Sequence, residues 1–233
     1  MVALAFAASL LLAGSFPLLD PDEGRNAEVA REMVEGGELV VPHLGGMPYL
    51  DKPPALFWVV AAAIQALGPT PFAARLPAAI AAALTLLVLA RLALRERGAA
   101  FAVRAVTLAA AAPLFAVLSA YVIFDMPLTL CVTVVWTALA RELEDGPHAG
   151  RRAAMFAAVT LGLLIKGPVM LGWALGGSLG AALLLRRRDA LRWLAWWPGW
   201  LALVALAGGW FALAAARHPE YWRYAFLEES LER

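Results

Sequence analysis

Long apolar stretches dominate the chain and predict membrane-spanning helices. The runs of spanning character cover residues 2–19, 72–90, 105–124, 126–140, 153–185 and 193–215. A transmembrane helix needs about 20 such residues. The run at 153–185 has 33 residues and is interrupted by Lys166-Gly167-Pro168, so it predicts a hairpin of two helices. The pattern therefore predicts an all-α integral membrane protein with about seven transmembrane helices.

The polar stretch after the first run predicts an extramembrane loop, residues 20–71, that carries juxtamembrane helices. The run at 2–19 has neither the basic start nor the cleavage site of a signal peptide, so we interpret it as a first span. The apolar run at 55–67 is short, which is typical of an interfacial helix that does not cross. Residues 26–36 place apolar and charged side chains on opposite sides, as in a helix lying along the membrane surface.

Composition supports the membrane assignment and narrows the function classes. The chain is 62% hydrophobic and 16% charged with a mean hydropathy of +0.73, against about 25% charged residues in soluble domains. The net charge of +1 gives no indication of a nucleic-acid partner. The single cysteine, Cys131, lies in an apolar run, which excludes a disulfide framework and favours a buried thiol. The three histidines have no metal-ligand spacing.

Arginine clusters predict the orientation of the helices. Three short loops hold most of them, and the positive-inside rule places these loops in the cytoplasm; they contain Arg91, Arg95, Arg97 and Arg104, then Arg141, Arg151 and Arg152, then Arg186, Arg187, Arg188 and Arg192. All three loops can lie on the same side only if residues 55–67 do not cross the membrane, because a crossing there would conflict with the first span and the loop at Arg91. Residues 20–54, the turn at Asp125, the turn at Lys166 and residues 217–233 then share the outer face.

Asp125 is the sharpest candidate for chemistry on that face. It follows Tyr121-Val122-Ile123-Phe124 and has no other charge near it in sequence. A carboxylate at bilayer depth costs roughly 2.5–3.5 kcal/mol on insertion scales, so such residues are functional candidates. The apolar run after it is about 22 Å long as a helix, against about 30 Å of hydrocarbon, which predicts a recess below the surface. The alternative is a structural ion pair, with Lys166 as the partner.

Lys52 and Lys166 are the two lysines of a chain that otherwise uses arginine. A compact ammonium is a point-charge phosphate binder, and both lie on the predicted outer face. The alternatives are a snorkelling anchor for Lys52 and neutralisation of a buried acid for Lys166. Asp20 and Asp22 have an alternative too, as cap and first-turn acids of the helix that follows.

These residues stand in a pattern that resembles the first outer loop of bacterial glycosyltransferases of the GT-C superfamily. Residues 20–77 are similar to the aminoarabinose transferases that modify lipid A and to protein O-mannosyltransferase-like enzymes. The matching pieces are Asp22-Glu23-Gly24-Arg25, Tyr49-Leu50-Asp51-Lys52-Pro53, Ala73-Ala74-Arg75-Leu76-Pro77, Phe124-Asp125-Met126, Lys166-Gly167-Pro168 and Phe226-Leu227-Glu228-Glu229. The resemblance covers nearly the whole chain and the N-terminal part of such an enzyme, so we expect residues 1–233 to be one transmembrane glycosyltransferase domain, truncated at its C-terminus.

The resemblance also implies roles for single residues. Asp22 falls on the family's loop aspartate, which acts as a base or orients the acceptor, and Asp125 falls on its second-loop aspartate. Lys52 falls on the lysine that contacts phosphate, and Asp51 on an acid near a metal in some members. The complete expected site has Asp22 and Asp125 as catalytic residues, Glu23, Arg25, Tyr49, Lys52 and Lys166 as substrate-binding residues, and Asp51 as a metal ligand. Members often have histidine where this chain has Ser230, so a divalent metal is an optional cofactor.

The implied activity is transfer of a sugar from a polyprenyl-phosphate carrier to a lipid A-like lipid or a protein. We expect a multi-pass protein of the bacterial inner membrane, surrounded by membrane lipids, with its active site on the periplasmic side. A transporter or flippase for a polyprenyl lipid is the alternative; it would have charges on several spans and internal repeats, and the sequence has no evident repeat. An inactive truncated paralogue is a third interpretation.

Overall fold

Helices make up most of the structure, a computed structural model that describes residues 1–221. The elements are α1 (Val2–Gly14), α2 (Asp22–Gly36), β1 (His43–Leu44), β2 (Met47–Pro48), α3 (Ala55–Leu67), α4 (Pro71–Ala111), α5 (Pro113–Leu118), α6 (Asp125–Asp145), α7 (Ala149–Lys166), α8 (Val169–Leu184), the 3-10 helix η1 (Arg188–Ala195), α9 (Trp197–Leu203), the π-helical turn η2 (Val204–Gly208) and α10 (Gly209–Arg217). Among the described residues, β1 and β2 are the only strands, and they form a two-residue antiparallel hairpin.

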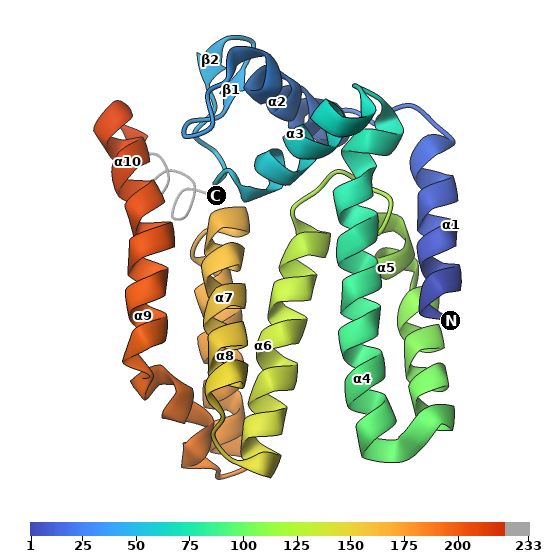
Figure 1. Ribbon diagram of the computed structural model, residues 1–233, viewed down its shortest axis with the longest axis vertical. Helices are drawn as coiled ribbons and strands as arrows, with labels where there is room; N and C mark the ends of the chain where they lie inside the picture. The colour runs from blue at the N-terminus through green and yellow to red at the C-terminus, as the bar shows by residue number, and fades with distance from the viewer. Residues whose placement is uncertain (222–233) are drawn as a thin grey trace.

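The long helices run side by side along one axis, as Figure 1 shows, so the bundle has two distinct ends. α2, α3 and the hairpin cover one end of the bundle, at the top of the view, and we call this the site end. The turn in α4, the α6–α7 loop and the α8–η1 connection lie at the opposite end, which we call the arginine end. All three predicted arginine clusters lie in or beside those connections. The clusters therefore share one end of the bundle, as predicted.

Three of the described helices are long and apolar enough to cross a membrane by length and composition: Pro71–Ala111, Asp125–Asp145 and the continuous Trp197–Arg217. The shorter α1 and α8 are also apolar, and α7 with α8 forms the predicted hairpin. α3 lies across the site end and does not follow the bundle axis (Figure 1), as expected for residues 55–67. The chain is therefore a multi-pass helical membrane protein.

Glycine and proline determine where helices turn or begin, and two predicted spans differ from the structure at a proline. α4 reverses at Gly98, whose φ of 77° lies in the left-handed region that glycine tolerates. The run predicted at 105–124 breaks before Pro113, which cannot continue a hydrogen-bonded helix and instead opens α5. The run predicted at 193–215 starts in the 3-10 helix η1 and becomes α-helical only from Trp197, with a proline in the first turn of α9.

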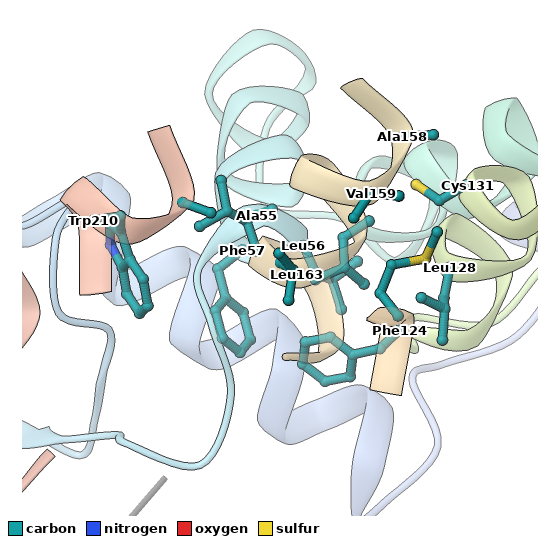
Figure 2. Packing of buried hydrophobic residues seen from close by; sticks show 14 of the residues in the cluster. Ala55, Leu56, Phe57, Phe124, Leu128, Cys131, Ala158, Val159, Leu163 and Trp210 are labelled. Atoms are coloured by element: carbon teal, nitrogen blue, oxygen red, sulfur yellow. The ribbon is translucent and has the colours of Figure 1, made fainter. Parts of the chain in front are cut away.

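One hydrophobic cluster joins the bundle to the layer formed by α2, α3 and the hairpin, which we call the capping layer. It contains side chains of α2, α3, α6, α7 and α10, several of which Figure 2 labels. The rings of Phe57 on α3 and Phe124 before α6 meet edge to face, with centroids 5.6 Å apart. Deeper in the bundle, Phe156 packs against the rings of Trp193, Trp196 and Trp200. Gly199 lies against Phe156 so closely that a Cβ there would stand 2.2 Å from the ring.

Hydrogen bonds fix the capping layer in place. Gly45 and Gly46, both with positive φ, form the tight hairpin turn, and their amides donate to the carboxylate of Glu32 on α2. The indole of Trp58 donates to the Leu39 carbonyl, and that of Trp210 donates to the Val40 carbonyl. The loop between α2 and β1 is thus held between α3 and α10.

Candidate active site

A fully buried ion pair, Glu23–Arg75, stands at the centre of the site end. Both side chains are 0% exposed, and their closest atoms are 2.7 Å apart. The Glu23 carboxylate accepts hydrogen bonds from Nε and Nη2 of Arg75 and from the amides of Leu19 and Val122. Burial alone would raise the pKa of Glu23, but the hydrogen bonds from Arg75, Leu19 and Val122 and the Arg75 charge together lower it below its ordinary value. Glu23 is ionised and saturated.

Arg75 uses its remaining donors on the chain segment after α1. Its Nη atoms donate to the carbonyls of Ala13, Phe16 and Pro17 at 2.8–3.0 Å. The carbonyls at the end of a helix have no partner within the helix, and Arg75 supplies one. The Arg75 guanidinium also lies 4.0 Å from the ring centroid of Phe16. One side chain of α4 therefore sets the path from α1 into α2.

The same cluster fixes the loop that leads to Asp125. The Val122 amide donates to Glu23, and the Val122 carbonyl accepts from Asn26 Nδ2 at 2.8 Å. Both backbone groups of one residue are thus held by α2. Asp22 and Asp125, about 100 residues apart in sequence, belong to segments that are hydrogen-bonded to each other at the site end.

Asp125 forms an ion pair with Lys166, at 2.8 Å between Oδ1 and Nζ. Asp125 is in the first turn of α6 and Lys166 in the last turn of α7, where the helix dipoles favour these charges. The side chains remain 38% and 30% exposed, respectively. The ion pair that we considered as the alternative is therefore present, but it leaves both groups accessible to a ligand.

Asp22 lies in the first turn of α2 and pairs with Arg25 at 2.5 Å, with side chains 45% and 39% exposed. Pro21 occupies the N-cap position of α2, and no side chain caps the helix there, so the capping role considered for Asp20 is wrong. Arg25 Nε is buried and has no hydrogen-bond partner among residues 1–221. Asp22 is an accessible carboxylate beside a saturated one.

Tyr49, Asp51 and Lys52 lie on the loop between the hairpin and α3. The Tyr49 ring packs edge to face on Phe57, with centroids 6.0 Å apart, and Phe57 packs in turn on Phe124. This row of three rings brings the loop beside the residue that precedes Asp125. Pro53 and Pro54 follow Lys52 and are buried, and α3 begins immediately after them.

An apolar groove of about 350 Å³ opens beside these residues. Its walls come from α3, α4, α6 and α7, and they include Ala55, Leu56, Pro127 and Ile165. These four residues lie within four positions of Lys52, Asp125 or Lys166 along the chain. The groove is thus lined by residues that are close in sequence to the charged groups of the site end.

The expected site is only partly assembled as predicted. Asp22, Arg25, Tyr49, Lys52, Asp125 and Lys166 all belong to the site end, whereas Glu23 is sealed inside, where its burial leaves no surface for a substrate. Within residues 1–221, no three His, Cys, Asp or Glu side chains gather in a group that could hold a metal. The metal role of Asp51 stays a prediction, and the matching tail at 226–229 lies outside the described residues. Arg75 and Asn26 are the residues that sequence reasoning missed, although Arg75 stands in one of the matching motifs.

A known protein family matches most of the chain. Residues 51–210 match the family described as dolichyl-phosphate-mannose-protein mannosyltransferase, and the chain belongs to that family. Fold and family together make it a multi-pass membrane protein of the glycosyltransferase type.

Individual relatives of the chain have more specific descriptions than the family. The chain is 32% identical over 228 residues to an undecaprenyl phosphate-α-4-amino-4-deoxy-L-arabinose arabinosyl transferase of Aeromonas salmonicida, covering 93% of this chain and 40% of the relative. A Pseudomonas aeruginosa protein of the same description is 32% identical over 91% of this chain and 39% of its own. The crystal structure of ArnT from Cupriavidus metallidurans in the apo state superposes with a TM-score of 0.89 at 29% identity, over 98% of this chain and 43% of ArnT. ArnT bound to undecaprenyl phosphate superposes with a TM-score of 0.83 at 26% identity, over the whole chain and 44% of ArnT. The chain thus spans about two fifths of the length of these relatives.

Proposed function

We propose that the chain forms the carrier-binding and catalytic face of a glycosyltransferase that moves a sugar from a polyprenyl-phosphate donor to an acceptor at the outer surface of the bacterial inner membrane. The observation that carries this proposal is an apolar groove whose lining residues stand within a few positions in sequence of the accessible charges at one end of the bundle. A polyprenyl-phosphate sugar has a long apolar tail and an anionic head, and the two parts of the site match those two parts.

The groove suits the tail and the lysines suit the head. Its walls are alanine, leucine, isoleucine, valine and proline side chains of α3, α4, α6 and α7. The phosphate would lie where the groove meets the loop of Lys52 and the Asp125–Lys166 pair, so that an ammonium group faces the bridging oxygen. The relative bound to undecaprenyl phosphate supports a carrier of this class.

The chemistry follows from which bond breaks. An acceptor oxygen attacks the anomeric carbon of the sugar while the bond from that carbon to the phosphate oxygen breaks. The electron pair leaves with the polyprenyl phosphate, and Lys52 stabilises the charge that builds there. If the acceptor is a hydroxyl, its proton passes to a carboxylate, for which Asp22 and Asp125 are the accessible candidates. If the acceptor is already anionic, as a lipid A phosphate is, the carboxylate only orients it.

The names of the relatives favour aminoarabinose as the sugar and so a pentosyl transfer. The family description favours a protein acceptor and a hexose. Both relatives described above are arabinosyl transferases by name, so we propose the first, with a lipid A-like acceptor. The arginine end faces the cytoplasm in this proposal, because the positive-inside rule requires it.

Release of polyprenyl phosphate from a polyprenyl-phosphate sugar by the full-length protein tests this proposal. Lys52→Ala should lower turnover at saturating donor by at least about a hundredfold, by analogy with loss of one transition-state donor. Lys52→Arg should recover only part of it, because a planar fork does not replace an ammonium point. Arg104→Gln, which removes a positive charge at the arginine end, is the matched control and should keep full turnover. Wild-type turnover in Lys52→Ala would refute the role of Lys52, and transport without release would favour the flippase.

A further inference from the structure

A second pocket, of about 410 Å³, lies at the arginine end between α4, α6 and α7. It is as far from the site described above as the bundle allows. Its charged lining residues among 1–221 are Arg91, Arg141 and Arg151, and no acid lines it. Nothing in the proposed transfer reaction uses these groups.

The arginines are only partly neutralised by their surroundings. Arg141 and Arg151 share the carboxylate of Asp145, at 2.9 and 3.3 Å, and Arg95 binds the same carboxylate from outside the pocket. The nearby acid Glu142 is already paired with Arg152. One further acid, Glu144, is exposed on the same turn. Three guanidinium groups around one carboxylate leave an excess of positive charge that an anion would satisfy.

Arg91 and Arg151 also have hydrogen-bond donors without a partner among residues 1–221, which favours a bound anion as well. Arg91 makes no ion pair or hydrogen bond with any residue of the described chain. Arg151 Nε is buried and has no hydrogen-bond partner there either. Guanidinium groups bind phosphate oxygens through two parallel hydrogen bonds, which makes arginine the preferred residue for such a site.

The pocket also has an apolar half, and the two halves are ordered along the bundle. On α4, Val88 stands one turn before Arg91, towards the bundle centre; on α6, Val134 and Ala138 stand before Arg141 in the same sense. On α7, which runs the other way, Ala154 follows Arg151 by one turn. Residues three or four apart share a helix face. All three helices therefore present an arginine outermost and small apolar side chains next to it.

The depth of this boundary matches a membrane surface. Arg91 is 20 residues beyond the first residue of α4, Pro71, at the site end. At about 1.5 Å per residue this is about 30 Å of helix, the thickness of the hydrocarbon core. The arginines thus stand at headgroup level, with the apolar half in the hydrocarbon.

We infer that this pocket binds the phosphate headgroup of an anionic phospholipid, with the acyl chains along the apolar half. Basic pockets between transmembrane helices on the cytoplasmic side are suited to such headgroups. A soluble anion would leave the apolar half unused, and a zwitterionic lipid would bring its own cation to the arginines. The lipid would connect α4, α6 and α7, which are the helices that carry Arg75, Asp125 and Lys166 at their other ends.

Native mass spectrometry of the delipidated chain tests this inference, with cardiolipin, phosphatidylglycerol, phosphatidylcholine and inorganic phosphate added separately. Both anionic lipids should bind more tightly than phosphatidylcholine, and binding should weaken with salt. Arg91→Gln should weaken cardiolipin binding about fivefold, and Arg91→Gln with Arg151→Gln about twenty-five-fold. Thr137→Trp, which fills the pocket without changing charge, should also weaken binding. Arg104→Gln removes the same charge from outside the pocket and should change binding less than Arg91→Gln.

Several outcomes would overturn the inference. Equal losses in Arg91→Gln and Arg104→Gln would indicate a general attraction between the arginine end and anionic membranes. Binding of inorganic phosphate as tight as that of cardiolipin would assign the pocket to a soluble anion. No preference for anionic lipid in the wild-type chain would mean that the pocket is not a lipid site. Arg91 has no partner among residues 1–221 to lose, so the Arg91→Gln result does not depend on a folding defect.

Discussion

Replacing Glu23 by glutamine tests whether the buried ion pair organises the site end. The substitution keeps the shape of the side chain and removes its charge. Glu23 now accepts from four donors, two of them on Arg75. A glutamine offers one oxygen and one amide nitrogen, so the nitrogen would face two N–H donors and lose their hydrogen bonds. Arg75 would be left buried with its charge uncompensated.

The size of the effect follows from that burial. Breaking a buried pair by removing one partner costs about 3–5 kcal/mol, because the remaining charge stays out of water. For a chain of this length each kcal/mol shifts the midpoint of thermal unfolding by about 2–4 °C, so the midpoint should fall by roughly 6–20 °C. The exposed pair Glu28–Arg31 on the same helix gives a matched control. Glu28→Gln should hardly change the midpoint, since exposed pairs contribute little.

Thermal unfolding in detergent measures both variants, and pH supplies a second readout. The pKa of Glu23 is lowered in the folded chain, so its contribution to stability is complete above the unfolded value of 4.5 and is lost as pH falls through the folded value. The difference in stability between wild type and Glu23→Gln should therefore shrink at pH values below about 4.5. A midpoint for Glu23→Gln within a degree or two of that for Glu28→Gln would refute the buried-pair argument.

Three further outcomes are expected. Asp125→Asn should lower turnover by about a hundredfold or more, and adding Lys166→Gln should not restore it; restoration by the double variant would mean that the pair is only structural. With Cys131 replaced by alanine, a cysteine at Gly45 should react with an impermeant thiol reagent only from the outer side, and labelling from inside would reverse the proposed orientation. Gly199→Ala should destabilise the chain by about 1–3 kcal/mol, because its Cβ would overlap Phe156; Gly209→Ala, where a Cβ meets nothing within 4 Å, is the control, and equal stability of the two variants in thermal unfolding would refute the packing argument.

The membrane fold could be predicted from the sequence because apolar runs and arginine loops carry direct physical signals. The hairpin at Lys166-Gly167-Pro168 and the non-crossing α3 are examples. The break at Pro113 was less predictable, because the run at 105–124 is apolar on both sides of it. The reversal at Gly98, in contrast, falls in the loop that the first arginine cluster predicts.

The site was predictable in its charges and not in its contacts. Asp125 and Lys166 were candidates because they are charged residues in apolar stretches of the sequence. In the structure they form an ion pair at 2.8 Å. Glu23 and Arg75 are 52 residues apart, and although Arg75 is a lone charge in the apolar run at 72–90, nothing in the sequence pairs it with Glu23. Only the three-dimensional arrangement shows that one of the two adjacent acids, Asp22 and Glu23, is exposed and the other enclosed. Nor does periodicity reveal that Val122 is held through its backbone.

The enclosed acid explains how the accessible ones can be placed. Asp22 and Asp125 are on separate helices, and within residues 1–221 each makes only one ion pair, so neither could fix its own position against a substrate. Glu23 stands next to Asp22 and binds the Val122 amide three residues before Asp125. Arg75 joins this cluster to the end of α1 and to α4. A saturated, buried carboxylate is not accessible to a substrate, but it can hold two loops at a constant separation. In the proposed transfer site, the rigid acid would hold the two accessible acids in position beside the substrate.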